Sequence, residues 1–328
     1  MEKILAGYVG RLAPSPTGAL HLGNVRTFMI AYLRARSLGG KVILRIEDLD
    51  HPRDKPGAAR EAVEDLKWLG FDWDEEYVQS ERKDIYREAL SLLPAYPCVC
   101  TRRDVENAQS APHAGEQLHY PGLCRGRFSS WREAAEFCGE GRLPCWRYRV
   151  DEGTVVSFTD VFAGDYSQNV SSVLGDFPIA RDEGGAGYTL AVVVDDLLSG
   201  VTEVVRGDDL IPATPAQILI AEKLLSWAES KTSHSVKIPK YCHVPLVVGP
   251  DGRRLAKRHG DTRVASYRAS GVEPETVIGR LAASCGWGDG KKASLHELID
   301  VFSLVCGETA WFCVRTPKKC LRRGLGSF

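Results

Sequence analysis

The sequence predicts an α/β fold built on a parallel sheet, with a separate inserted region in its middle. Strand-like and helix-like segments alternate from the amino terminus to Gly70, which is the pattern of parallel strands joined by crossover helices. The alternation resumes after residue 186. Residues 95–185 differ, because they combine a cysteine cluster, many glycines and prolines, and short strand-like runs such as Trp146–Val150.

The first half of the predicted sheet begins with a short strand over residues 7–13, followed by a turn-rich loop. Helix-compatible residues extend from Leu22 to Leu38 and end at a glycine pair. Lys41–Ile46 has the apolar character of a buried strand. Pro56–Leu69 is predicted to be a helix, because proline suits the first turn of a helix and Gly70 follows the end of this one.

The second half is predicted to begin with strands at Tyr188–Val194 and Val201–Val205. A helix is predicted to start at Thr214–Gln217, a segment with the spacing of a capping box and proline at its first helical position. Residues 227–240 are polar and predicted to form a loop. From Glu273 onward the chain has a helical pattern that fades toward its end.

The composition excludes several classes of protein. The 328 residues are 44% hydrophobic and 26% charged, which is ordinary for a globular protein and unlike a disordered or fibrous one. The formal net charge is −1, so binding of nucleic acid would need local basic patches. The candidate patches are Arg34 with Arg36, Arg102 with Arg103, and residues 253–258.

The distribution of apolar residues indicates where in the cell the protein is found. No apolar run approaches the roughly 18 residues that a membrane span needs, and residues 1–15 lack the pattern of a signal peptide. We therefore expect a cytoplasmic protein without membrane contact. In that compartment the ten cysteines are expected to be free or metal-bound rather than paired as disulfides.

The chain lacks the usual glycine-rich phosphate-binding motifs, but the loop after the first predicted strand offers another place for a nucleotide. His21, Gly23 and Asn24 open the following helix, where unpaired N–H groups and the positive end of the helix dipole attract phosphates. Gly23 would let a flat base or a phosphate approach the backbone. His21 could donate to charge that develops on an α-phosphate.

A second cationic segment, Arg253–Arg258, follows a turn formed by residues 249–252. Mobile cations beside a turn can hold a pyrophosphate leaving group in a transition state. Taken alone, this segment also fits an ordinary solvated surface loop.

Four segments in order resemble the signatures of class I glutamyl-tRNA synthetases: residues 11–24, Arg45–Asp50, Val205–Leu210 and Arg254–Arg258. The resemblance covers about residues 5–290. It implies a Rossmann-like catalytic domain in two halves, 1–94 and 186–270, an insertion over 95–185, and a helical segment with a tail over 271–328. Two positions depart from the family's cationic loop, because Arg254 stands in place of its first lysine and Ala256 in place of its serine.

The resemblance also implies roles for individual residues. Glutamate would be bound by Arg11, Ser15, Glu47, Tyr188 and Arg206, with Glu47 on its α-ammonium and Arg206 on its side-chain carboxylate. ATP would contact His21, Gly23, Asn24, Arg254 and Lys257, of which His21 and Lys257 would act in catalysis. The role of Arg206 is chemically reasonable, because a guanidinium binds a carboxylate through two parallel hydrogen bonds.

Cys98, Cys100 and Cys124 have a spacing that can surround one tetrahedral Zn²⁺. The residues alone leave the fourth ligand open between Tyr120 and the chemically more ordinary His119 and His113. The complete pattern of the three cysteines with Tyr120 resembles the zinc site of glutamyl-queuosine tRNA(Asp) synthetases, in which the tyrosine is a ligand. We therefore expect one structural Zn²⁺.

These resemblances imply an enzyme that joins glutamate to ATP, assisted by Mg²⁺, and transfers the glutamyl group to queuosine at the wobble position of tRNA(Asp). It would take the anticodon loop into its cleft, act as a monomer, and lack an anticodon-binding domain. Two alternatives stay open: a truncated or discriminating glutamyl-tRNA synthetase that charges the tRNA 3′ end, and an inactive paralogue that only binds tRNA. The retention of His21, Glu47, Arg206 and Lys257 argues against the inactive paralogue.

Overall fold

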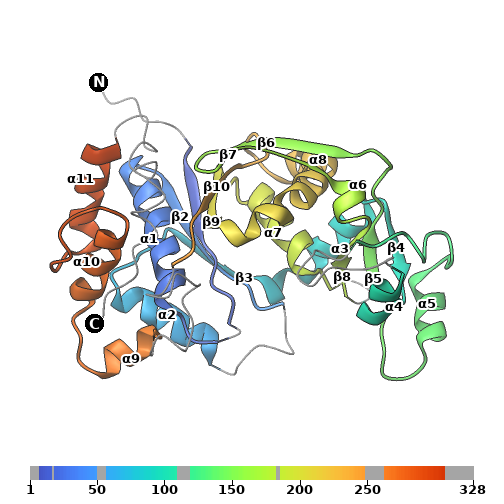
Figure 1. Ribbon diagram of the computed structural model, residues 1–328, viewed down its shortest axis with the longest axis horizontal. Helices are drawn as coiled ribbons and strands as arrows, with labels where there is room; N and C mark the ends of the chain where they lie inside the picture. Colours follow the sequence, from blue (N-terminus) through green and yellow to red (C-terminus); the bar gives the residue numbers. More distant parts are fainter. Residues whose placement is uncertain are drawn as a thin grey trace.

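The computed structural model describes residues 7–16, 18–49, 57–108, 119–181, 185–247 and 262–306. Figure 1 shows an elongated molecule with the first strands and the last helices at one end and the inserted elements at the other. None of the described helices combines the length and the apolar character that crossing a bilayer requires.

The first three strands form a parallel sheet in the order β1-β2-β3. The strands are β1 (Val9–Leu12), β2 (Lys41–Ile46) and β3 (Glu75–Val78), and they are connected by α1 (Leu22–Ser37) and α2 (Ala58–Trp68). All residues of β2 after its first are buried, as expected for a strand covered on both faces. The strand–helix alternation predicted for this half is therefore confirmed.

A second parallel pair joins β9 (Glu203–Gly207) to β10 (Lys240–Val244). Thr202, just before β9, donates its backbone N–H to the carbonyl of Val9 over 3.0 Å, so β9 begins beside β1. This places the first residues of β1 and β9, which are far apart in sequence, next to each other.

Between these strands the chain forms antiparallel structure. One sheet has the order β4-β5-β8, and a separate hairpin pairs β6 with β7. The strands are β4 (Ala95–Cys98), β5 (Cys145–Tyr148), β6 (Val155–Asp160), β7 (Gly164–Asn169) and β8 (Phe177–Ala180). The accompanying helices are α3 (Lys83–Ser91), α4 (Arg102–Asn107), α5 (Trp131–Cys138) and α6 (Val170–Val173).

Three details of the second half differ from the sequence predictions. Tyr188–Val194 is not a strand but the start of helix α7 (Tyr188–Leu198), whose residues from Leu190 to Leu197 are all buried. Helix α8 (Thr214–Lys231) extends into the predicted loop, and Thr214 forms no capping box. Instead, the Thr214 hydroxyl lies in a buried hydrogen-bond cluster with Arg206 and His243.

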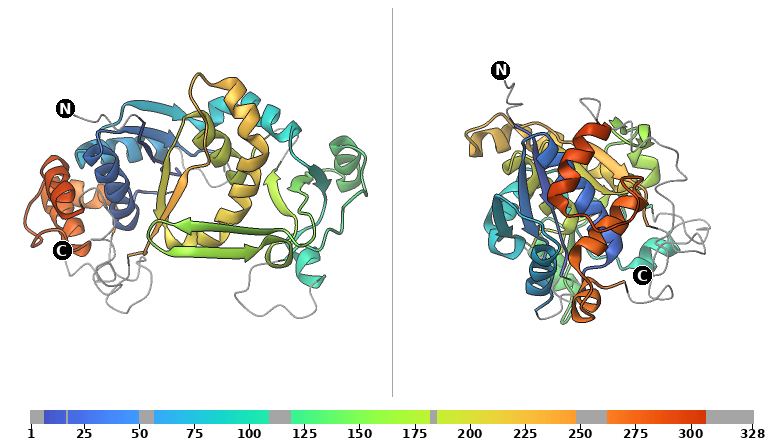
Figure 2. Two further views of the ribbon diagram at one scale, coloured as in Figure 1. Left: turned by 90° about the horizontal axis from the view of Figure 1, so that it is seen from above. Right: turned by 90° about the vertical axis from the view of Figure 1, so that its left-hand side faces the viewer.

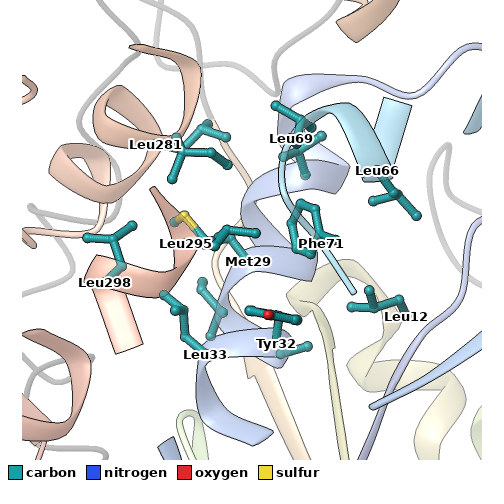
Figure 3. Close-up of a cluster of buried hydrophobic side chains, with 14 of the residues drawn as sticks. Leu12, Met29, Tyr32, Leu33, Leu66, Leu69, Phe71, Leu281, Leu295 and Leu298 are labelled. Carbon is teal, nitrogen blue, oxygen red and sulfur yellow. The ribbon is translucent and has the colours of Figure 1, made fainter. Parts of the chain in front are cut away.

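One of the hydrophobic cores lies between α1 and its neighbours. Figure 3 shows Met29 of α1 among Leu12, Phe71, Leu281 and Leu295, which come from both ends of the chain. The helices after residue 262 are α9 (Val264–Ala269), α10 (Pro274–Ser284) and α11 (Leu295–Cys306). The last two confirm the helical pattern predicted from Glu273 onward, and α9 precedes it. Figure 2 shows α10 and α11 covering α1, so the carboxyl-terminal helices help to fix the helix that opens the candidate site.

Candidate active site

A cavity of about 660 Å³ lies where β1, β2 and β9 end. In parallel α/β sheets, ligands bind at this edge because loops and helix N-termini converge there. Eight of the residues proposed from sequence to bind glutamate or ATP line this one cavity: Arg11, Ser15, His21, Gly23, Asn24, Glu47, Tyr188 and Arg206. Its volume is in the range of small-molecule sites.

Glu47 lies directly after β2 and is held in place by a neighbouring arginine. Arg45 donates from Nε and Nη2 to Oε1 of Glu47, over 3.2 and 3.0 Å, and from Nη1 to Asp196 over 2.6 Å. The Ser15 hydroxyl donates to the other oxygen, Oε2, over 3.4 Å. Burial raises the pKa of Glu47, while Arg45 and Arg11 oppose that rise. Sequence reasoning missed the contributions of Arg45 and Asp196.

Arg11 and Arg206 supply positive charge to the same cavity. Arg11 on β1 donates from Nη1 to the carbonyl of Val205 over 3.0 Å and lies 3.7 Å from Asp196. Burial lowers the pKa of Arg11 from its usual value. Arg206 on β9 is also buried, and its guanidinium lies over the ring of Tyr241 at 5.3 Å. Two buried guanidiniums and one carboxylate suit a ligand that carries both kinds of charge.

The N-terminus of α1 forms another wall of the cavity. His21 is the N-cap residue, and its Nδ1 lies 3.2 Å from the Thr262 hydroxyl. The backbone N–H of Leu22 donates to the carbonyl of Thr262 over 3.0 Å. Val247 and Thr262, the described residues on either side of 248–261, both line the cavity. Arg254 and Lys257 lie outside the described residues.

The three predicted cysteine ligands lie together in the insertion. The sulfur atoms of Cys98, Cys100 and Cys124 are within 4.8 Å of one another, and the last two are 3.5 Å apart. Two thiolates bound to one tetrahedral zinc at about 2.3 Å lie about 3.8 Å apart, so this cluster fits the ion. A hydrogen bond from Cys145 holds the pKa of Cys98 well below its usual range, with help from Tyr120 and Arg147, which favours the thiolate that a metal needs.

Tyr120 is the better placed of the described candidates for a fourth ligand. Its hydroxyl oxygen lies 3.2 Å from Cys98 Sγ and 3.5 Å from Cys100 Sγ. His119 instead has its Nε2 3.0 Å from the carbonyl of Ser171. His113 lies outside the described residues.

Three arginines of the predicted basic patches form ion pairs with acidic side chains. Arg34 pairs with Glu203 at 3.2 Å, and Arg36 pairs with Asp72 and Asp74 at 2.5 and 2.8 Å. Arg102 pairs with Glu106 at 2.9 Å. The pair Arg34 and Arg36 therefore stabilises the fold rather than forming a free basic surface.

The comparisons with known proteins agree with this geometry. The family model of tRNA synthetases class I (E and Q), catalytic domain, matches residues 8–311. The chain belongs to this family. A Glutamyl-Q tRNA(Asp) synthetase of Symbiobacterium thermophilum is 45% identical over 311 residues, covering 90% of the chain and 92% of that protein. One from Rhodopirellula baltica is 47% identical over 311 residues, covering 90% of each.

Longer members of the family match as well. The chain is 43% identical over 303 residues to the Glutamate–tRNA ligase of Aquifex aeolicus and covers 61% of it. The crystal structure of a glutamate–tRNA synthetase from Elizabethkingia anophelis matches with a TM-score of 0.70 and 29% identity, over 89% of this chain and 65% of that chain. These matches confirm the family resemblance and the α/β fold predicted from sequence.

Gly23 lines the cavity and provides a test of the expectation from sequence that ATP binds along the N-terminus of α1. A Cβ added there would have Val247 as its nearest neighbour, at 3.9 Å, so a side chain would extend into the cavity without displacing the fold. We expect Gly23→Leu to raise the KM for ATP at least about tenfold. Gly23→Ala should raise the KM for ATP less than Gly23→Leu does. It should also raise the free energy of unfolding by up to about 1 kcal/mol, because alanine is the better helix former. Thermal unfolding and ATP titration separate these effects, and an unchanged KM for ATP in Gly23→Leu would place the nucleotide elsewhere.

Proposed function

We propose that this chain activates glutamate with ATP and transfers the glutamyl group to queuosine in the anticodon loop of tRNA(Asp). The observation that carries the proposal is the match to two Glutamyl-Q tRNA(Asp) synthetases over nine-tenths or more of each relative. The cavity adds chemical support, because it gathers buried arginines and a buried carboxylate at the ends of parallel strands. Both tRNA and ATP are cytoplasmic, and we place a monomeric enzyme there.

In this proposal the charged ends of glutamate are read by different residues. Glu47 accepts from the α-ammonium through Oε2, since Oε1 is already held by Arg45. Arg11 and Ser15 bind the α-amino and α-carboxylate groups of glutamate, and Tyr188 contacts the amino acid. Arg206 binds the side-chain carboxylate. Tyr188 is 43% exposed and lines the cavity, so a bound ligand can contact it.

ATP occupies the other part of the cavity, along the N-terminus of α1. Gly23 and Asn24 face the nucleotide, His21 donates to the α-phosphate, and Arg254 with Lys257 contact the departing phosphates. The substrate carboxylate attacks the α-phosphorus, the bond to the β-phosphate oxygen breaks, and pyrophosphate leaves as glutamyl-adenylate forms. Mg²⁺ bound with ATP offsets the phosphate charge. Catalysis of this kind depends on positioning and charge stabilisation.

The cysteine cluster serves structure in this proposal. Cys98, Cys100, Cys124 and Tyr120 hold one Zn²⁺ that stabilises the inserted region. None of the described residues that line the cavity comes from residues 95–185, so the metal lies away from the adenylation chemistry.

Glutamate-dependent exchange between ATP and pyrophosphate without any tRNA is the expected outcome that tests this function. An enzyme that modifies a single-stranded wobble base can read the splayed base directly and has no need of tRNA to order its amino-acid pocket. Ordinary glutamyl-tRNA synthetases, by contrast, require bound tRNA for this step. An isolated anticodon stem-loop that carries queuosine should also accept labelled glutamate, and the same stem-loop with guanosine at that position should not.

The alternative acceptor gives a distinct result. Exchange that strictly requires intact tRNA, with label on the 3′ adenosine, would show a glutamyl-tRNA synthetase of the ordinary type. Absence of exchange under both conditions, with tRNA still bound, would indicate the inactive paralogue.

A further inference from the structure

On the side away from the cavity, the Arg206 guanidinium donates hydrogen bonds to two residues that do not line the cavity. It is the register partner of His243 on the adjacent parallel strand β10. Its Nε donates to Nε2 of His243 over 3.0 Å, and its Nη2 donates to the Thr214 hydroxyl over 2.8 Å. A guanidinium has five N–H groups. These contacts occupy its Nε edge, so a carboxylate in the cavity would bind end-on, through the two terminal nitrogens.

This arrangement requires one particular tautomer of His243. Its Nε2 must carry a lone pair to accept from Arg206, so its proton must be on Nδ1. Nδ1 lies 2.6 Å from Oδ2 of Asp160, and an ionised carboxylate can only accept. Both side chains are fully enclosed, and burial lowers the pKa of His243, which keeps the ring neutral.

Asp160 is itself fixed in orientation. It is the last residue of β6, and its Oδ1 accepts from the backbone N–H groups of Phe162 and Ala163 over 3.0 and 2.7 Å. The backbone N–H of His243 also lies 3.1 Å from each carboxylate oxygen. The carboxylate therefore cannot rotate without losing several buried hydrogen bonds. Figure 1 shows the β6–β7 hairpin, whose first strand ends at Asp160, reaching from the inserted region to β10.

We propose that Asp160 and His243 are positioning residues that act through Arg206 to set the selectivity of the pocket for a side-chain carboxylate over an amide. The inference rests on the proposed function, in which Arg206 binds the side chain of glutamate. A proton on Nε2 of His243 would face the Nε–H of Arg206 and push the guanidinium out of its end-on orientation. The inserted hairpin thus contributes to amino-acid recognition although its residues do not touch the cavity.

Asp160→Asn tests the contacts from Asp160 through His243 to Arg206 with a minimal change. The amide oxygen can keep the Oδ1 contacts, while the amide nitrogen replaces the oxygen that faces Nδ1 and becomes a donor. His243 must then carry its proton on Nε2, against Arg206. In exchange between ATP and pyrophosphate, we expect the KM for glutamate to rise at least about tenfold, with kcat changed less than about threefold. The preference for glutamate over glutamine should fall by a similar factor.

Two variants of His243 sharpen the test. His243→Phe keeps a ring that can stack on Tyr241, whose plane lies 8° from that of the imidazole, but has no acceptor for Arg206. We expect it to reproduce the effect of Asp160→Asn. His243→Gln places an amide oxygen near the position of Nε2, and it should recover part of the affinity for glutamate. Direct calorimetric binding of glutamate should follow the same order.

Cys242→Ala is the matched control, because Cys242 is buried on the same strand but belongs to the core cluster on its opposite face. It should lower the unfolding temperature without changing the glutamate-to-glutamine preference. If the wild type is active but Asp160→Asn and His243→Phe keep the preference for glutamate, the positioning role is wrong and the proposed function stands. The same conclusion follows if these two variants differ from the wild type only as much as Cys242→Ala does. A wild-type protein that neither binds glutamate nor supports exchange would overturn the proposed function together with this inference.

Discussion

Arg206→Leu is expected to raise the KM for glutamate by more than about 100-fold, equivalent to a loss of about 3 kcal/mol or more. The guanidinium is buried and fixed by His243 and Thr214, so its counter-charge is available without reorganisation. Leucine would leave the substrate carboxylate in a buried pocket without a partner. The KM for ATP should change little, because in the proposed function Arg206 binds the amino acid and not the nucleotide. Initial rates of exchange at varied glutamate and ATP measure both constants.

Arg206→Lys separates charge from geometry. Lysine keeps a positive charge but cannot present two parallel donors or donate at the position of Nε. Its effect should therefore lie between those of the wild type and Arg206→Leu. If Arg206→Leu binds glutamate within about threefold of the wild type, another cation reads the side chain, and Arg11 would be the first to examine, because it lines the same cavity.

Helix α7 shows where sequence reasoning failed on the fold. The run from Leu190 to Val194 is continuously apolar, and a short apolar run cannot be assigned to a strand or a buried helix by periodicity. The structure explains the absence of a periodic signal, because all residues from Leu190 to Leu197 are buried, Asp195 and Asp196 included. The error did not affect the site, since Tyr188 still lines the cavity from the first residue of that helix.

The residues that support the site were harder to predict than those that line it. Arg11, Glu47 and Arg206 lie in segments with recognisable signatures at the ends of strands. His243 and Asp160 are 83 residues apart in sequence, and their contact depends on how the inserted hairpin packs on β10. The register of β9 against β10, which pairs Arg206 with His243, is also a tertiary property. A sequence shows residue types and local spacing, but these relations between distant strands require the fold.

The cysteine cluster belongs to a small core that has little apolar area of its own. The buried members of this core are Cys98, Val99, Val105, Tyr120, Cys124 and Ala134. Half of them are the proposed ligands, so removal of the metal would leave closely spaced thiols in place of a packed centre. Small cores of this kind generally need a metal or disulfides for stability. No disulfide links the described cysteines, so in our proposal the bound metal stabilises this core.

Cys98→Ser is therefore expected to release one Zn²⁺ per chain and to loosen the region around residues 95–138, while glutamate-dependent exchange stays within about threefold of the wild type. The contrast arises because structural zinc contributes directly to folding free energy, whereas the described lining of the adenylation cavity lies outside that region. Metal analysis, limited proteolysis and exchange assays on the same preparation measure the three effects. Cys138→Ser, at a partly buried thiol outside the three-cysteine cluster, is the matched control and should retain the metal. Freshly purified wild-type protein without zinc, or a Cys98→Ser variant that keeps it, would rule out this metal site.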